Sequence, residues 1–138
     1  MRLCSRFFLI TLLVACTVAG TAAAQQGRAD PLLNRFYGLR EKNPAAARAA
    51  LEQAVRRFPH DLRVQLEFGY LTLKAGEKVR ALAAFRAAVA LAPGRADLWR
   101  QIGYIENDLA NHPAALEAFE ESLRLDPGNG DQRGGEQD

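Results

Sequence analysis

Cysteine is nearly absent from this 138-residue chain, and both copies, Cys4 and Cys16, lie among the first 24 residues. If that segment is removed, the remaining chain has no disulfide, no thiol nucleophile and no thiolate metal ligand. Hydroxyl nucleophiles are also scarce, because Thr72 and Ser122 are the only threonine and serine after residue 24. β-Branched residues are sparse in the alanine- and leucine-rich middle of the chain, and no segment alternates apolar with polar residues. We therefore predict an all-α protein.

Groups that could perform catalysis do not converge in the sequence. His60 and His112 lie in predicted loops, and neither has a second histidine or a carboxylate at the spacing of metal ligands. Glu120 and Glu121 are neighbours on a predicted helix, so their carboxylates point in different directions. No glycine-rich phosphate loop occurs. We predict that the protein is not an enzyme, with no catalytic residue, no metal ligand and no cofactor.

The first 24 residues have the pattern of a secretion signal. Arg2 and Arg6 precede an apolar run, and small residues then lead to a run of alanines that ends at Ala24. Cleavage after Ala24 is the first interpretation. The second is a lipoprotein signal that ends before Cys16, since the residues up to Cys16 resemble a lipobox whose cysteine becomes lipidated. The third is an uncleaved anchor, although the run is barely long enough to span a bilayer. All three predict export to the periplasm or to the periplasmic face of the envelope, with membrane attachment through Cys16 in the second.

The charge of the exported chain would be close to zero. The whole sequence has 18 basic and 16 acidic residues, and two basic residues lie in the signal, which leaves 16 of each sign. A near-neutral chain argues against nucleic acid as a partner. The charge is uneven, since residues 35–63 hold seven basic and three acidic residues, while residues 97–138 hold three basic and ten acidic ones. This polarity could orient a partner or a second copy of the chain, although solvated faces are the simpler interpretation.

The middle of the chain contains a sequence repeat with a constant interval of 34 residues. Gly69 and Tyr70 recur as Gly103 and Tyr104. The same interval relates Ala81 to Ala115, Leu82 to Leu116, Ala84 to Ala118, Phe85 to Phe119, Leu91 to Leu125 and Pro93 to Pro127. A fainter copy lies upstream, in which Phe36 precedes Tyr70 by that interval. We therefore divide residues 30–127 into units of about 30–61, 62–95 and 96–129, after a linker at 25–29.

The third unit carries a recognisable helix–turn–helix signature. Its marked positions are Trp99, Ile102, Gly103, Ala115, Phe119 and Pro127. This pattern resembles the tetratricopeptide repeat, and it departs from that family at Glu106, where an aromatic residue is usual. The resemblance implies a right-handed α-solenoid of about three repeats behind the signal sequence.

Turn and cap residues agree with this arrangement. Asp30-Pro31 and Asn43-Pro44 are typical of a helix cap followed by proline, and Gly76 and Ala110 mark turns within units. The tail at 130–138 is glycine, glutamine and charge, and we expect it to be disordered.

No further helix is predicted after Pro127, so the end of the array needs another solution. We expect the last helix to cap itself, with a polar stripe that faces solvent opposite Ala115, Phe119 and Leu123. The polar stripe consists of Glu117, Glu120, Glu121 and Arg124. The alternative is that another chain covers this end.

The resemblance also implies where a partner would bind. In tetratricopeptide proteins the first helices line an inner groove that holds peptides, and Phe36, Tyr70 and Tyr104 would form an aromatic ladder along it. The implied partner-binding residues are Phe36, Arg63, Leu66, Tyr70, Leu73, Lys74, Asp97, Arg100, Gln101, Tyr104, Asn107 and Asp108. The alternative is that these aromatic residues only pack within the array. The Lys and Asn pairing with which some family members clamp a C-terminal carboxylate is missing.

These observations predict a non-catalytic adaptor in the bacterial cell envelope that binds a protein or peptide segment in its groove. The alternative is a homo-oligomeric or assembly component of an envelope or export complex that makes its contacts through the ends of the solenoid.

Overall fold

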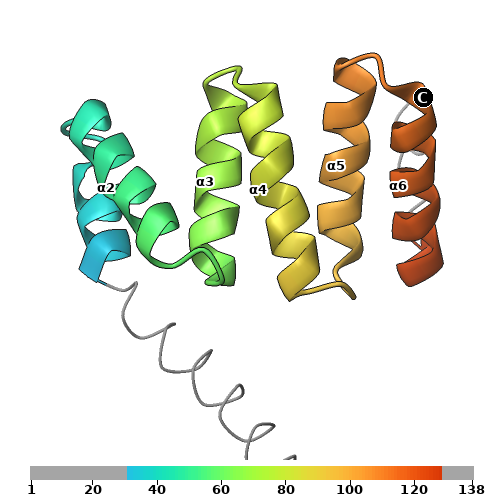
Figure 1. The fold of residues 1–138 in the computed structure, drawn as a ribbon, viewed down its shortest axis with the longest axis horizontal. Coiled ribbons are helices and arrows are strands. Elements are labelled where there is room, and N and C mark those ends of the chain that lie inside the picture. Colours follow the sequence, from blue (N-terminus) through green and yellow to red (C-terminus); the bar gives the residue numbers. More distant parts are fainter. Residues whose placement is uncertain (1–30, 129–138) are drawn as a thin grey trace, which may run out of the picture. The chain divides into compact units, whose positions relative to one another are not determined.

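The computed structural model describes residues 31–128, and all structural statements below concern that range. A first helix covers residues 31–39. It is followed by α2 (Pro44–Arg57), α3 (Leu62–Lys74), α4 (Lys78–Leu91), α5 (Ala96–Asp108) and α6 (His112–Leu125) (Figure 1). No strand occurs within 31–128, and the predicted all-α class is confirmed. Among these helices none combines the length and hydropathy needed to cross a bilayer. The predictions for the signal, Cys16, Asp30, the linker and the tail fall outside the described residues.

The chain divides into two compact units, Met1–Val64 and Gln65–Asp138, which are described separately. In the first unit, α2 begins as predicted: the side chain of Asn43 accepts a hydrogen bond from the backbone N–H of Ala46 at 3.1 Å, and Pro44 follows at the first helical position. Along α2, Arg48 donates to Glu52 at 3.2 Å. The buried apolar residues of this unit are Leu33, Phe36, Ala47, Ala50, Leu51, Ala54 and Val64.

The second unit contains the same helix contact twice. The backbone of Gly69 in α3 lies against the ring of Phe85 in α4, and Gly103 in α5 lies against Phe119 in α6. A Cβ atom at Gly69 would be 3.1 Å from the Phe85 ring, and one at Gly103 would be 2.6 Å from the Phe119 ring. At Gly103 a Cβ atom would force the Phe119 ring to move, whereas at Gly69 it would make a tight contact with the Phe85 ring.

The turns between paired helices in this unit use left-handed backbone conformations. Gly76 (φ 77°) joins α3 to α4, and Ala110 (φ 60°) joins α5 to α6. Glycine adopts this conformation without strain, whereas alanine does so at a cost of about 1 kcal/mol. Both turns lie where the sequence predicted them.

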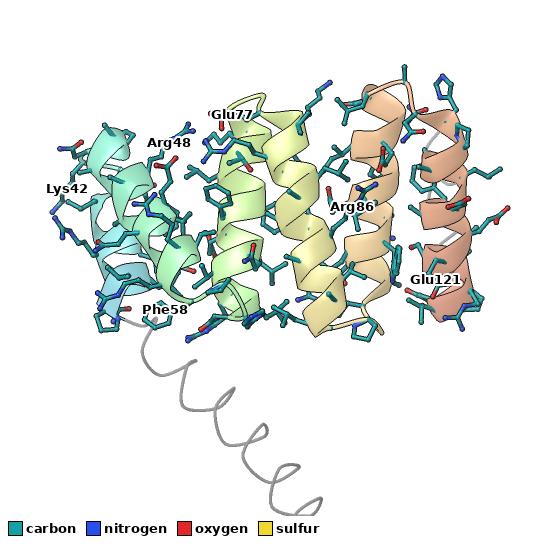
Figure 2. All side chains as sticks on the ribbon, viewed as in Figure 1. Lys42, Arg48, Phe58, Glu77, Arg86 and Glu121 are labelled. Atoms are coloured by element: carbon teal, nitrogen blue, oxygen red, sulfur yellow. The ribbon has the colours of Figure 1, made fainter. Side chains whose placement is uncertain are left out.

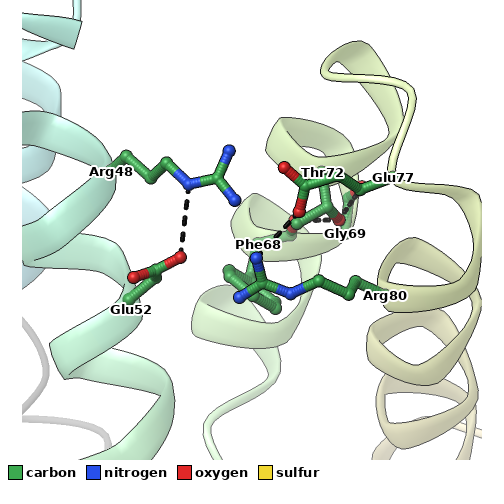
Figure 3. A network of polar contacts seen from close by, with 7 residues as sticks. All are labelled: Arg48, Glu52, Phe68, Gly69, Thr72, Glu77 and Arg80. Carbon is green, nitrogen blue, oxygen red and sulfur yellow. Dashed lines mark hydrogen bonds and ion pairs between the residues drawn. The ribbon is translucent and has the colours of Figure 1, made fainter. Parts of the chain in front are cut away.

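Buried polar groups in the second unit are satisfied locally. The hydroxyl of Thr72 donates to the carbonyl oxygen of Phe68 at 2.7 Å and lies 3.1 Å from that of Gly69 (Figure 3). Nearby, the guanidinium of Arg80 lies 5.0 Å from the Phe68 ring centroid. Ser122 of α6 donates to the carbonyl oxygen of Ala96 at 2.8 Å, which links the end of α6 to the start of α5. Each of the two buried hydroxyls therefore has a backbone hydrogen-bond acceptor, within α3 for Thr72 and on α5 for Ser122.

The outer face of α6 differs from the prediction. Leu123 was expected on the buried side, but it is 48% exposed, and Leu116 is 59% exposed. The equivalent residues of the preceding repeat, Val89 and Leu82 in α4, are only 7% and 8% exposed. In α4 this face is covered by α5, whereas no described helix follows α6. The predicted polar stripe does face solvent at Glu117, Glu120 and Arg124. In addition, α6 exposes an apolar stripe, Leu116 and Leu123, and the prediction that Leu123 is buried is wrong.

Candidate functional site

Tyr70 and Tyr104 occupy equivalent positions on α3 and α5, and both are exposed. Their exposed fractions are 45% and 36%. Each ring rests edge-on against the phenylalanine of the partner helix: the ring centroids of Tyr70 and Phe85 are 5.1 Å apart at 80°, and those of Tyr104 and Phe119 are 5.2 Å apart at 70°. This packing is worth about 0.5–1.5 kcal/mol beyond the area that it buries. Each tyrosine ring therefore packs against the partner helix and is also partly exposed to solvent, which combines the two alternatives left open by the sequence.

Phe36 does not continue this pattern, because its side chain is buried, in line with the alternative of packing within the array. Its side chain is 4% exposed, whereas the neighbouring Tyr37 is 42% exposed. The second and third repeats have a glycine against a phenylalanine ring. At the equivalent position the first repeat has Arg35, which is exposed. A guanidinium cannot be buried there without a charge partner, so the helix 31–39 presents Phe36 to the core instead. Of the three aromatic residues predicted to line the groove, only Tyr70 and Tyr104 are exposed.

An ion pair stands at the start of α5. Arg95 donates from Nε to Oδ1 of Asp97 at 3.1 Å and from Nη2 to Oδ2 at 2.6 Å. The hydrogen bond from Arg95 is the main reason why the pKa of Asp97 lies below its ordinary value. The pKa of Arg95 is raised, chiefly by the hydrogen bond to Asp97, with a smaller electrostatic contribution from Tyr70. Asp97 is therefore ionised and oriented at neutral pH, in the neighbourhood of Tyr70.

The remaining predicted partner-binding residues are held less uniformly. Asp108 forms an ion pair with Lys78 at 3.0 Å, and the side chain of Asn107 lies 3.2 Å from His112 Nδ1. Lys74 is exposed. Half-buried positions are taken by Leu66, Leu73, Arg100 and Gln101. Arg63 belongs to the first unit, where its backbone N–H donates to Asp61 at 3.0 Å. Among the predicted positions, the structure therefore fixes Asp97 through its ion pair with Arg95 and Asp108 through its ion pair with Lys78.

Sequence reasoning missed a second feature, on α5. Glu106 appeared there only as a departure from the family pattern, but its side chain is 2% exposed. Its Oε1 is paired with the guanidinium of Arg86 from α4, and its Oε2 accepts from Asn111 Nδ2 at 2.9 Å. A charged residue at an aromatic position was the only signal in the sequence.

A cleft opens above this carboxylate, between α4 and α6. Its volume is about 490 Å³, and α5 forms its floor. The lining residues are Arg86, Val89, Ala90, Trp99, Ile102, Glu106, Ala114, Glu117, Ala118 and Glu121. Within residues 31–128, no group of three His, Cys, Asp or Glu side chains is arranged to hold a metal ion.

Paired helices joined by tight turns, with a glycine–phenylalanine contact that recurs in successive units, define a helical repeat protein. A family model described as tetratricopeptide repeat matches residues 39–96 and again residues 66–130, which together make up more than half of the chain. The chain belongs to the tetratricopeptide repeat family. Members of this family are generally non-catalytic scaffolds, and the repeats give this chain the fold of a protein–protein interaction scaffold.

A solved structure supports the fold. The structure described as "Crystal structure of MamA" superposes with a TM-score of 0.63 at 22% sequence identity. The match covers 80% of this chain and 65% of that one, so the present chain spans about two thirds of its length. At this level of identity the likeness concerns the fold alone. No curated protein matches the sequence.

Proposed function

We propose that the protein is an adaptor that binds an extended segment of a partner protein across the tyrosine face, defined here as Tyr70, Tyr104, Arg95 and Asp97. The observation that supports this most is the repeated exposure of tyrosine at 45% and 36% on successive first helices. Such rings offer large contact areas at a low cost in conformational entropy, since only two torsions must be fixed.

The chemistry of the face suits a peptide with both apolar and polar groups. Because Phe85 and Phe119 already hold the edges of the rings, binding would not have to order them. Each phenol hydroxyl can donate or accept a hydrogen bond. The Arg95–Asp97 pair is 42% and 41% exposed, so both charges can interact with a ligand while they remain paired. We expect an extended segment with apolar side chains toward the rings and a polar group near Asp97.

The experiment that tests this proposal is site-specific photo-crosslinking in intact cells. One photoreactive residue replaces Tyr104, and the comparison replaces Glu120, which is exposed on α6. We expect adducts from Tyr104 that disappear when Tyr70 is changed to serine on the same chain, while adducts from Glu120, if any form, are unaffected by Tyr70→Ser. Adducts from Glu120 alone would rule out the tyrosine face as the binding site.

We also propose that the protein acts in the bacterial cell envelope. The supporting observation is the order of charge, apolar run and small residues over positions 1–24. Intact-mass measurement of the protein from cells distinguishes the routes: loss of residues 1–24 indicates ordinary cleavage, whereas a lipid-modified chain that begins at Cys16 indicates a lipoprotein. A full-length, unmodified protein in the cytosol would contradict export.

A second candidate is assembly through the end of the array, and the apolar stripe on α6 favours it. Leu116 and Leu123 lie two helical turns apart on one exposed face, a spacing that matches a helix-packing seam. If this stripe mediates assembly, Leu116→Gln with Leu123→Gln reduces the molar mass seen by light scattering, and Tyr70→Ser leaves it unchanged. A monomer at every concentration before mutation would remove this candidate.

A further inference from the structure

The cleft above α5, called here the α5 cleft, lies outside the tyrosine face and carries its own chemistry. Its lining includes three carboxylates, Glu106, Glu117 and Glu121, but only one cation, Arg86. Trp99 is half-buried on the same floor, and its indole N–H donates to the carbonyl oxygen of Pro93 at 3.2 Å, which fixes the ring. An aromatic wall beside an excess of carboxylates is a surface that favours a cationic side chain.

Glu106 is the unusual member of this group. Removal of a carboxylate from water costs several kcal/mol unless charge and hydrogen bonds compensate for the loss. At 2% exposure, Glu106 obtains that compensation from one neutral amide, Asn111, and one cation, Arg86. The arginine is therefore the only partner that neutralises its charge.

Arg86 reaches this carboxylate from the surface. Its side chain is 58% exposed, and it extends from α4 toward α5 (Figure 2). Because this side chain is long and more than half exposed, its guanidinium can move into solvent when another cation takes its place beside Glu106. The pair shows what the cleft accepts: a planar guanidinium that enters from outside, above a buried carboxylate.

Two further carboxylates would meet an incoming arginine at the rim. Glu121 is already paired with Arg124 at 2.5 Å, whereas Glu117 is exposed and has no described partner. Displacement of Arg86 by another arginine keeps Glu106 neutralised, and the released Arg86 can face Glu117 or solvent. The exchange therefore leaves no buried charge without a partner.

We infer that the α5 cleft is a binding site for an arginine side chain of a partner protein, which displaces Arg86 from Glu106 and lies beside Trp99. The site is independent of the tyrosine face, because it is formed by α4, α5 and α6 on residues that the tyrosine face does not use. A partner could therefore be recognised by an arginine here even if no peptide binds at Tyr70 and Tyr104.

The chain provides its own probe for this site. Trp99 is the only tryptophan, so its fluorescence reports on the α5 cleft alone. The purified protein is titrated with a short alanine peptide that contains one arginine, and in parallel with the same peptide in which citrulline replaces arginine. We expect a saturable change in emission with the arginine peptide and none with the neutral citrulline peptide.

Three variants test which residues of the α5 cleft determine the affinity for the arginine peptide. Arg86→Ala should tighten binding of the arginine peptide at least about threefold, because the competing guanidinium is gone. Glu106→Gln should weaken it about tenfold or more, since a charged hydrogen bond is lost. Glu120→Gln, on α6 outside the cleft, is the matched control and should change nothing.

Two results would overturn the inference. One is the absence of a saturable response in both the native protein and Arg86→Ala. The other is an equal loss of affinity in Glu106→Gln and Glu120→Gln, which would indicate general attraction to acidic surface. If Glu106→Gln fails to fold by circular dichroism, the gain in Arg86→Ala decides, and a loss of affinity in that variant contradicts the competition.

Discussion

Replacement of Gly103 by alanine tests how closely α5 and α6 must approach. A Cβ atom there would lie 2.6 Å from Cε1 and 2.7 Å from Cδ1 of Phe119. The same change at Gly69 would place a Cβ atom 3.1 Å from the nearest atoms of Phe85. Carbon atoms in good contact are about 3.5–4.0 Å apart, so the Phe119 ring must move by about 1 Å and the Phe85 ring by about half as much.

The free-energy change has two opposing parts. An alanine in a helix is about 1 kcal/mol more favourable than a glycine, whereas overpacking costs about 1–3 kcal/mol. For Gly103→Ala we place the overpacking cost near the upper end, which gives a net loss of about 1–2 kcal/mol in the free energy of unfolding. For Gly69→Ala the overpacking cost is near the lower end, and the gain in helix propensity offsets it, so the free energy of unfolding should be nearly unchanged.

Urea unfolding at pH 7, followed by helical circular dichroism, measures both values. Phe119→Leu is the control variant, because it removes the ring that the new methyl group at residue 103 would meet. In that background Gly103→Ala should become neutral or stabilising by up to about 1 kcal/mol. An equal loss with and without Phe119, or a larger loss at Gly69 than at Gly103, would refute the account.

Two smaller effects follow from single contacts. Asn43→Ala removes the cap of α2 and should lower the free energy of unfolding by about 1 kcal/mol, as measured by thermal unfolding, whereas Asn34→Ala, inside the exposed part of helix 31–39, should not. Asp97→Asn should lower stability by about 0.5 kcal/mol or less at pH 7, because the pair with Arg95 is more than one third exposed and screened by solvent. Since the pKa of Asp97 is lowered on folding, this contribution is present above the ordinary value of 3.8 and is lost as the pH falls through the lowered value. A loss that grows toward acidic pH would contradict the assignment.

The helices and their repeated contact could be predicted because a few residues leave little choice. Gly69 and Gly103 allow a close approach, and Phe85 and Phe119 on the next helix fill the space that they leave. Such a pair at a fixed offset indicates paired helices without any knowledge of distant contacts. The partial exposure of Tyr70 and Tyr104 was expected from the resemblance to the repeat family, which places them along the inner groove.

Three features could not be predicted, for one physical reason. The repeat interval gives the position of a residue along its helix, but it does not reveal which other element covers that residue. Phe36 has the right register, yet Arg35 changes which side of its helix faces the core. Leu123 has an apolar side chain, but its exposure depends on whether another helix follows α6. Glu106 is neutralised by Arg86, which is 20 residues away and on another helix, so no local spacing reveals the pair.

The uncovered stripe on α6 has a consequence for engineering and for evolution. Leu116 and Leu123 are equivalent to Leu82 and Val89 of α4, which are buried. A tandem duplication of residues 96–129 would therefore place a helix equivalent to α5 on a surface that already fits it, and no existing contact would have to be redesigned. Each added copy would present the same surface to the next.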